Sequence, residues 1–313
     1  MKNLTRSETA QILLSHDNYA IVTHRRPDGD TLGSSAVLCM GLRQLGKTAY
    51  ILENPEITPK YAHLHAGLCK PFAEEGDFLV TVDVASAGML PDCFKHLTFD
   101  LRIDHHGNAT SFTPVELVEP GAAACGEIVY GLLTEMGAAL DIPMANALYT
   151  AISTDTGCFR YANTTADTFA AASACAKAGA EVFAINQALF ETNSLARLKV
   201  QAYMLENAIF LQDGKIAICP LPKAVEKNCG AGEDDLDNIS GFPRTIEGVK
   251  LAVTIREEGT ERVKMSVRAV PGQDASALCA KFGGGGHKGA AGASMNKTME
   301  EAVAAVIAEL PII

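Results

Sequence analysis

The sequence predicts an α/β protein with two domains. The first has a mainly parallel sheet with flanking helices, and the second is a smaller α/β domain with antiparallel hairpins. Between residues 17 and 120, short apolar runs alternate with helical patterns, which is typical of a parallel sheet. After about residue 206, hairpin turns replace this alternation. A chain of 313 residues with 48% hydrophobic content is sufficient for two cores.

The strands of the first domain are expected at five apolar runs. Several are nearly continuous in apolar residues, as strands buried on both faces tend to be. The segment 31–47 carries apolar residues at helical spacing and has Gly46 as a C-cap, so it predicts a helix between the first two strands. Further helices are expected at 126–137, 144–154 and 165–179. The five strand segments are 18–23, 48–53, 77–83, 100–106 and 114–119.

The second domain is expected to follow a helical connector at 186–206. Asp213-Gly214 predicts one hairpin turn and Glu258–Thr260 a second. A glycine cluster at Gly283–Gly286 and a last helix at 298–310 complete the chain. We therefore expect a first domain at 1–190, a linker at 191–205 and a second domain at 206–313.

Composition excludes several function classes. The formal charge of −11 disfavours the broad basic surface that binds long duplex nucleic acid. Nine cysteines without a C-x-x-C pair predict neither a disulfide framework nor a thiolate zinc site. No apolar run is long enough to span a membrane, and the amino-terminal residues lack the apolar stretch of a signal peptide. We expect a cytoplasmic protein without a membrane partner.

Acids and histidines follow three of the predicted strands. The carboxyl ends of strands in an open α/β sheet lie along one edge, where ligands bind, so these side chains are expected to meet there. Asp155, after a predicted helix, is a fourth contribution. Such a mixed nitrogen and oxygen ligand set suits Mn²⁺ and similar ions. Taken alone, Asp28-Gly29-Asp30 is more often a turn with a helix N-cap than a metal site, because Asp and Gly are favoured there. The residues at the strand ends are His24, Asp28, Asp30, Asp83, Asp104, His105 and His106.

Six short motifs together resemble the DHH phosphoesterase family. Four lie in the first domain: HRRPDGD (24–30), VTVD (80–83), IDHH (103–106) and ISTDTG (152–157). Two lie in the second, SVRA (266–269) and FGGGGHKGAAG (282–292), where they resemble the associated C-terminal domain of that family. Within the family, the chain most resembles the branch of bifunctional oligoribonucleases and pAp phosphatases, the nanoRNases.

This resemblance implies a catalytic first domain with two Mn²⁺ ions, for which Mg²⁺ and Co²⁺ are alternatives. A pair of such ions neutralises phosphoryl oxygens and activates water. Asp83 would bridge the ions, His106 would contact the scissile phosphate or protonate the leaving oxygen, and Asp104 would orient a histidine. The implied ligands are His24, Asp28 and Asp83 for one ion, and Asp30, Asp83, His105 and Asp155 for the other.

In the second domain the resemblance implies a substrate-binding site for an anionic group. The backbone amides of Gly284, Gly285 and Gly286 would approach the anion closely, and Arg268 and His287 would add charge-assisted hydrogen bonds. A purely structural alternative is a glycine-rich turn that closes a helix. However, consecutive glycines carry an entropic cost that a simple turn does not require.

The implied function is a metal-dependent phosphoesterase that releases 5′-mononucleotides from very short single-stranded RNA and converts pAp to AMP. Hydrolysis of cyclic dinucleotides or of linear pNpN is an alternative within the family. A non-catalytic nucleotide sensor would lack some of the ligands, but all are present in this sequence. The glycine motif argues against the related inorganic pyrophosphatases. Whether the chain acts as a monomer or a homodimer stays open.

Overall fold

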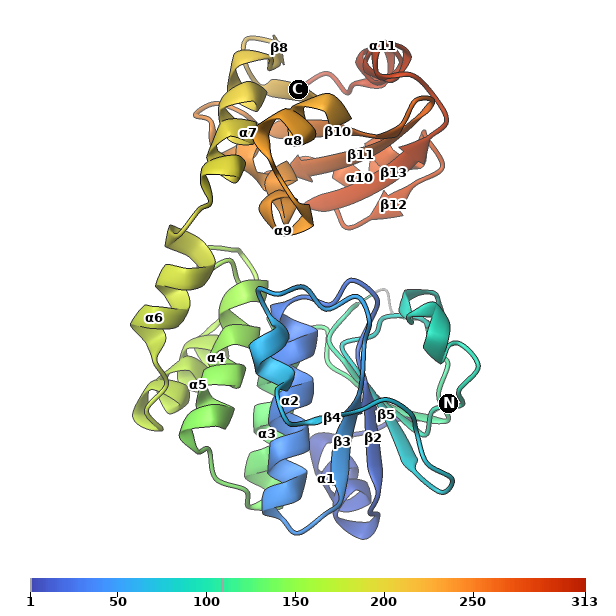
Figure 1. Cartoon of the computed structure of the whole chain (residues 1–313), viewed down its shortest axis with the longest axis vertical. Coiled ribbons are helices and arrows are strands. Elements are labelled where there is room, and N and C mark those ends of the chain that lie inside the picture. The colour runs from blue at the N-terminus through green and yellow to red at the C-terminus, as the bar shows by residue number, and fades with distance from the viewer. Residues whose placement is uncertain (1, 108–109) are drawn as a thin grey trace. The chain divides into compact units, whose positions relative to one another are not determined.

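A computed structural model describes residues 2–107 and 110–313 of the chain (Figure 1). The chain divides into two compact units, residues 1–192 and 193–313. Most of the segment 191–205, which we expected to be a linker, is helix α7 (Leu195–Glu206), and this helix belongs to the second unit.

The first unit is built on a seven-stranded sheet, in which every pair of neighbouring strands is parallel. Its strand order is β1-β7-β6-β5-β2-β3-β4, so the predicted parallel sheet is confirmed. Two short edge strands, β1 and β4, were not predicted, because two residues are too few for a periodic pattern. The strands are β1 Lys2–Asn3, β2 Tyr19–Val22, β3 Ala49–Leu52, β4 Cys69–Lys70, β5 Phe78–Val82, β6 Leu101–Asp104 and β7 Val115–Val118.

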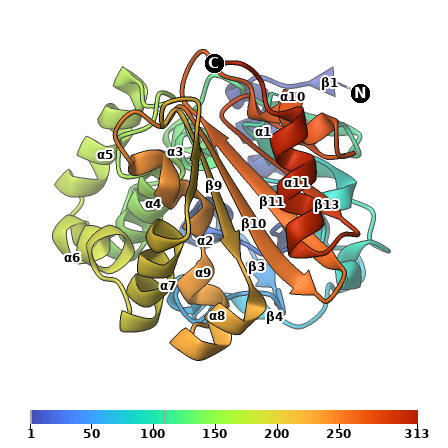
Figure 2. The same ribbon diagram turned by 90° about the horizontal axis from the view of Figure 1, so that it is seen from above.

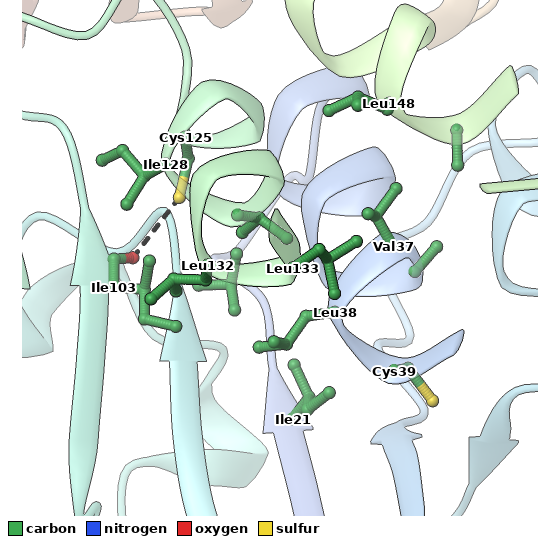
Figure 3. Close-up of a cluster of buried hydrophobic side chains, with 14 of the residues drawn as sticks. Ile21, Val37, Leu38, Cys39, Ile103, Cys125, Ile128, Leu132, Leu133 and Leu148 are labelled. Carbon is green, nitrogen blue, oxygen red and sulfur yellow. Dashed lines mark hydrogen bonds between the residues drawn. The ribbon is translucent and has the colours of Figure 1, made fainter. Parts of the chain in front are cut away.

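Alternate residues of the central strands pack on opposite faces of this sheet. Ile21 and Ile103 join a core formed with the helices on one face, where Leu38 and Leu132 pack (Figure 3). Val22 faces the other way, toward a smaller cluster under the 3₁₀ turns Ala87–Met89 and Asp92–Phe94. The strands are therefore buried on both faces. The helices are α1 Arg6–Ser15, α2 Gly29–Gln44, α3 Cys125–Met136, α4 Ile142–Asp155, α5 Ala166–Lys177 and α6 Val182–Asn186.

The second unit contains a six-stranded mixed sheet with strand order β12-β13-β11-β10-β9-β8. The two predicted hairpins are present as the antiparallel pairs β8–β9 and β10–β11, whereas β9 and β10 run parallel. One face packs against α10 and α11, and Figure 2 shows α11 lying over the strands of this sheet. The strands are β8 Ile209–Leu211, β9 Ile216–Leu221, β10 Leu251–Gly259, β11 Arg262–Ala269, β12 Gly285–Gly286 and β13 Ala290–Met295. The helices after α7 are α8 Lys223–Cys229, α9 Glu233–Leu236, α10 Ala275–Ala280 and α11 Met299–Glu309.

Within the described ranges, no helix combines the length and the apolar character that a membrane span requires.

Candidate metal centre

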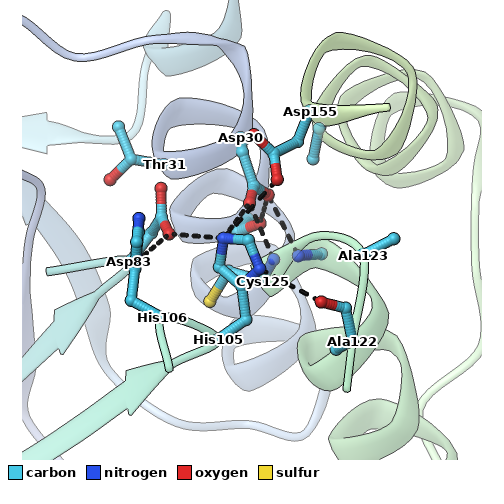
Figure 4. Close-up of polar contacts among 12 residues, drawn as sticks. Asp30, Thr31, Asp83, His105, His106, Ala122, Ala123, Cys125 and Asp155 are labelled. Atoms are coloured by element: carbon cyan, nitrogen blue, oxygen red, sulfur yellow. Dashed lines mark hydrogen bonds and ion pairs between the residues drawn. The ribbon is translucent and has the colours of Figure 1, made fainter. Parts of the chain in front are cut away.

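Acidic and histidine side chains meet at the carboxyl edge of the first sheet, at the ends of β2, β5 and β6, and α4 adds Asp155 (Figure 4). The side chains form three groups, and within each group the potential ligand atoms all lie within 4.8 Å of one another. They are His24, Asp28 and Asp83; Asp30, His105 and Asp155; and Asp83, His105 and His106. The structure therefore brings together all six residues that the family resemblance implies as ligands, and Asp83 is shared between two groups.

His24 is held so that one ring nitrogen faces the carboxylates. Its Nδ1 lies 2.8 Å from the carbonyl oxygen of Arg25 and donates to it, because a carbonyl can only accept. Nε2 then carries no proton in the neutral ring, and it lies 3.7 Å from Asp28 and 3.6 Å from Asp83. Buried Asn54 donates to the His24 carbonyl at 2.8 Å and so anchors this loop. The arrangement presents Nε2 as a ligand atom.

Asp28 and Asp30 follow β2 at the start of α2. Asp28 is the N-cap of this helix and accepts hydrogen bonds from the amides of Asp30 and Thr31. The N-cap interpretation of this segment is thus correct, and Asp28 also belongs to a candidate ligand group. Asp30 is almost fully buried and accepts bonds from the Ser34 hydroxyl and from the amides of Cys125 and Gly126. These bonds fix the carboxylate at the start of α3.

Asp83 follows β5 in an unusual backbone conformation. Its φ is +62°, in the left-handed region, which costs a non-glycine residue free energy and recurs at functional sites. Its amide still donates to the carbonyl of Ile103 at 2.9 Å, so the residue is fixed against β6. The side chain is buried, and its Oδ1 has no hydrogen-bond partner among the residues that the structure describes. A buried carboxylate oxygen of this kind is a suitable ligand for a cation.

His105 shows the same arrangement as His24. Its Nδ1 donates to the carbonyl of Ala122 at 3.1 Å (Figure 4), which leaves Nε2 to face the acids. This atom lies 3.4 Å from Asp83, 3.5 Å from Asp155 and 3.7 Å from Asp30. An imidazole nitrogen surrounded by three carboxylates is the donor set of a divalent cation site.

His106 turns toward Asp104, which lies behind it. The His106 Nδ1 donates to Asp104 Oδ1 at 2.8 Å, and it lies 3.6 Å from Asp83 Oδ1. Asp104 is fully buried, and the guanidinium of buried Arg102 lies 3.9 Å from its Oδ2. Arg102 also pairs with Glu116 at 2.6 Å and donates to the carbonyl of Ala85. Asp104 thus fixes the orientation of His106, and Arg102 supplies a positive charge beside the Asp104 carboxylate.

The crowding of carboxylates perturbs several pKa values. Burial and the charges of Asp83 and Asp28 raise the pKa of Asp155 to about 7. Burial opposes protonation of His105, yet its contacts with Asp83, Asp30 and Asp155 raise the pKa of that ring to about 11. Protons therefore compensate the negative charge of this cluster. A divalent cation can supply that positive charge instead, so we expect its binding to release protons.

The candidate residues of the second unit lie on β11 and in the segment 284–287 around β12, on either side of β13. Arg268 on β11 is in register with Ala290 on β13, and the amide of His287 donates to the carbonyl of Ala290 at 2.8 Å. In the adjacent strand β12, Gly285 and Gly286 pair with Gly292 and Ala291.

The glycines of this motif differ in why they are needed. A Cβ on Gly284 would lie 2.2 Å from the carbonyl oxygen of Gly292, and one on Gly286 would lie 2.6 Å from that of Ala290. Gly286 also has a φ of +145°. For these two, the close β12–β13 pairing itself requires glycine. A Cβ on Gly285 would meet no atom within 4 Å, so the fold does not explain that glycine.

Sequence reasoning missed two buried polar residues that support the site, Arg102 and Asn54. Arg102 could have been found, because a charged residue stands between Leu101 and Ile103 in a buried strand and must therefore have a partner. Asn54 gives no such signal, because its partners Thr23 and His24 lie 31 and 30 residues earlier in the chain.

Comparisons with known proteins agree with this arrangement. A model of the DHH family, N-terminal domain, matches residues 18–152, and a DHHA1 domain model matches residues 221–310. The bifunctional oligoribonuclease and PAP phosphatase NrnA of Thermus thermophilus is 33% identical over 88% of this chain and 83% of its own. The Bacillus subtilis protein of the same name is 27% identical over 93% of each chain. A solved exopolyphosphatase-related protein from Bacteroides fragilis superposes with a TM-score of 0.83 at 25% identity, covering 97% of this chain and 94% of its own.

Proposed function

The chain belongs to the DHH family of phosphoesterases, and from that premise we propose that it uses two Mn²⁺ ions to cleave very short RNA to 5′-mononucleotides and to convert pAp to AMP. Relatives over most of its length are named for oligoribonuclease and PAP phosphatase activity, which supports this substrate class. The observation that carries the proposal is the inward orientation of the His24 and His105 Nε2 atoms toward three buried or half-buried carboxylates and exposed Asp28.

The donor set fits a pair of divalent ions. His24 and Asp28 would hold one ion, Asp30, His105 and Asp155 the other, and Asp83 would bridge them, because it shares a group with each histidine. When bound, such ions neutralise phosphoryl oxygens and lower the pKa of a water bound to them to about 7. The near match between the ionic charge and the carboxylates would let an anionic phosphate approach.

The residues of the chain supply orientation and proton handling. The carbonyls of Arg25 and Ala122 keep the two ligand imidazoles in the tautomer that presents Nε2. Asp104 holds the Nδ1 proton of His106 at 2.8 Å and thereby fixes this ring beside Asp83. Burial opposes protonation of His106, but the hydrogen bond with Asp104 raises the pKa of this ring above its ordinary value. The His106 ring is therefore favoured in its cationic form. We assign to His106 the contact with the scissile phosphate and the proton for the leaving oxygen.

For the second unit we propose a role in binding a substrate phosphate. Arg268 on β11 is in register with Ala290 on β13, and the amide of His287, directly after β12, donates to the carbonyl of the same Ala290, which favours joint recognition of one anion. The motif needs Gly284 and Gly286 for its own hairpin, so the contribution of glycine to ligand approach is assigned to Gly285.

The test compares kcat/KM on one panel of substrates with Mn²⁺ present: dinucleotide to long RNA, pAp, cyclic dinucleotides and pNpN. We expect the highest values on short RNA and pAp and no activity after chelation. Activity that survives complete metal removal would overturn the mechanism. If kcat/KM were highest on cyclic dinucleotides or pNpN, the chain would be assigned to hydrolysis of those dinucleotides instead of short RNA and pAp.

The matched variant is Asp83→Asn, because asparagine tolerates the left-handed conformation that Asp83 adopts. We expect kcat to fall by about 100-fold or more, since losing a direct ligand should exceed the effect of changes behind the ligands. The control is Asp213→Asn, which changes a left-handed aspartate in the β8–β9 turn (φ +56°) and should leave kcat unchanged. Equal kcat in the two variants would refute the role of Asp83.

A further inference from the structure

The chain makes a left-handed turn directly after the candidate ligand Asp155. Gly157, Cys158 and Phe159 have φ values of +55°, +58° and +61°, and two of the three are not glycine. Such a run costs free energy and persists only where surrounding contacts hold it. Here the Phe159 ring stacks on Phe169, with centroids 5.5 Å apart, and the following residues turn back toward α4. The turn thus brings Asn163 to the end of the helix that carries Asp155.

Asn163 connects two backbone segments at this point. Its side-chain nitrogen donates to the carbonyl oxygen of Asp155 at 3.1 Å and to that of Ala123 at 3.0 Å. The Asp155 carbonyl belongs to the last helical residue of α4, where carbonyls lack intrahelical partners. One carboxamide therefore both caps this helix end and ties it to the segment before α3.

The segment Ala122–Gly126 contacts the other two members of the same ligand group. The Ala122 carbonyl accepts the Nδ1 proton of His105, and the amides of Cys125 and Gly126 donate to Asp30. Figure 4 places Ala122, Ala123 and Cys125 around Asp30, His105 and Asp155. His105, Asp30 and Asp155 thus all depend on this five-residue segment, and Asp155 is joined to it through Asn163.

We propose that Asn163 is a positioning residue for one metal ion, the ion held by Asp30, His105 and Asp155. The inference deepens the proposed function and rests on it. Asn163 acts through the backbone of Asp155 and Ala123. Among the described residues, no hydrogen bond or ion pair joins His24 or Asp28 to this segment, so the affinity of the ion that they would hold should change much less.

The test is a Mn²⁺ titration of the full-length, chelator-treated chain by calorimetry and electron paramagnetic resonance. In Asn163→Leu, which keeps the side-chain size and removes both donors, we expect one ion to bind about 10–100-fold more weakly, the range for losing a support behind a ligand. The second ion should keep its affinity, so the isotherm should separate into two phases. Asn163→Ala should behave in the same way, which guards against a steric artefact of leucine.

The matched control is Asn207→Leu, because exposed Asn207 also donates its side-chain nitrogen to a backbone carbonyl, that of Tyr203 at 2.9 Å, in the second unit. It should leave both affinities unchanged. If the Asn163 variants lose thermal stability without metal yet bind two ions normally, Asn163 is only structural and the inference is wrong. If the wild-type chain binds no divalent ion, the proposed function fails together with it.

Discussion

At the scale of single residues, buried polar groups fall into two kinds. Asp83 and Asp30 lie at the candidate centre, where a cation would compensate their charge. His65 lies away from it, packed on α2, with its Nε2 3.1 Å from the Leu32 carbonyl and 3.0 Å from the Ser35 hydroxyl. Nε2 must carry the proton to satisfy the carbonyl, and within residues 2–107 and 110–313 the buried Nδ1 has no hydrogen-bond partner. A second proton there would create a buried cation without an acceptor.

This environment predicts a pH-dependent stability. Burial lowers the pKa of His65 from 6.5 to about 4. Because the folded state resists protonation and the unfolded state does not, the contribution is complete above about pH 6.5 and is lost as the pH falls toward 4. The loss amounts to about 3 kcal/mol. His65→Gln should flatten this part of the pH profile of the free energy of unfolding, measured by urea denaturation.

Exposed His96 provides the control, since His96→Gln should leave the profile unchanged. Parallel profiles for His65→Gln and the wild-type chain would show that other groups cause the acid sensitivity.

At the scale of elements, the β12–β13 hairpin separates structural from functional glycines. Gly286 has the positive φ and faces the Ala290 carbonyl, whereas Gly285 has open space around its Cα. The two positions are adjacent in one short strand, so they experience the same sequence context but different packing.

Alanine at each position should therefore give opposite results. Gly286→Ala should lower the free energy of unfolding of the chain by about 1–3 kcal/mol, the cost of a strained backbone. Gly285→Ala should leave that free energy within about 1 kcal/mol of wild type, yet raise KM for pAp, because a methyl group would hinder the approach of a phosphate. Urea denaturation and steady-state kinetics measure the two effects. Unchanged KM in Gly285→Ala would remove this glycine from the substrate site.

At the scale of the whole molecule, charge limits the substrate. The chain has 37 acidic and 26 Lys or Arg residues, a formal charge of −11. Long single strands bind through rows of cations that neutralise many phosphates, and an acidic chain of this composition offers few. Affinity should come from the candidate metal centre and from a few cations such as Arg268.

We therefore expect the initial rate to be highest on RNA of about two to five nucleotides and to fall steeply with length, with a shallow salt dependence. Rates on 5′-labelled RNA from two to about twenty-four nucleotides, at two salt concentrations, measure both effects. Equal or faster cleavage of the longest RNA, with binding that weakens steeply in salt, would reveal a basic track and contradict this expectation.

The sequence by itself determined the local features of the protein. Apolar runs predicted the central strands, and the Asp213-Gly214 and Glu258–Thr260 turns predicted the two hairpins, because strand and turn preferences depend on near neighbours. The position of acids at strand ends predicted that they would meet, since the carboxyl ends of parallel strands share one edge.

Only the tertiary structure decided how the site is held. The ring of His105 is oriented by Ala122, 17 residues away, and Asp30 by the amides of Cys125 and Gly126, 95 and 96 residues away. The parallel pairing of β9 with β10 is likewise a long-range contact. A local pattern carries no information on such partners, because they are chosen by how whole elements pack.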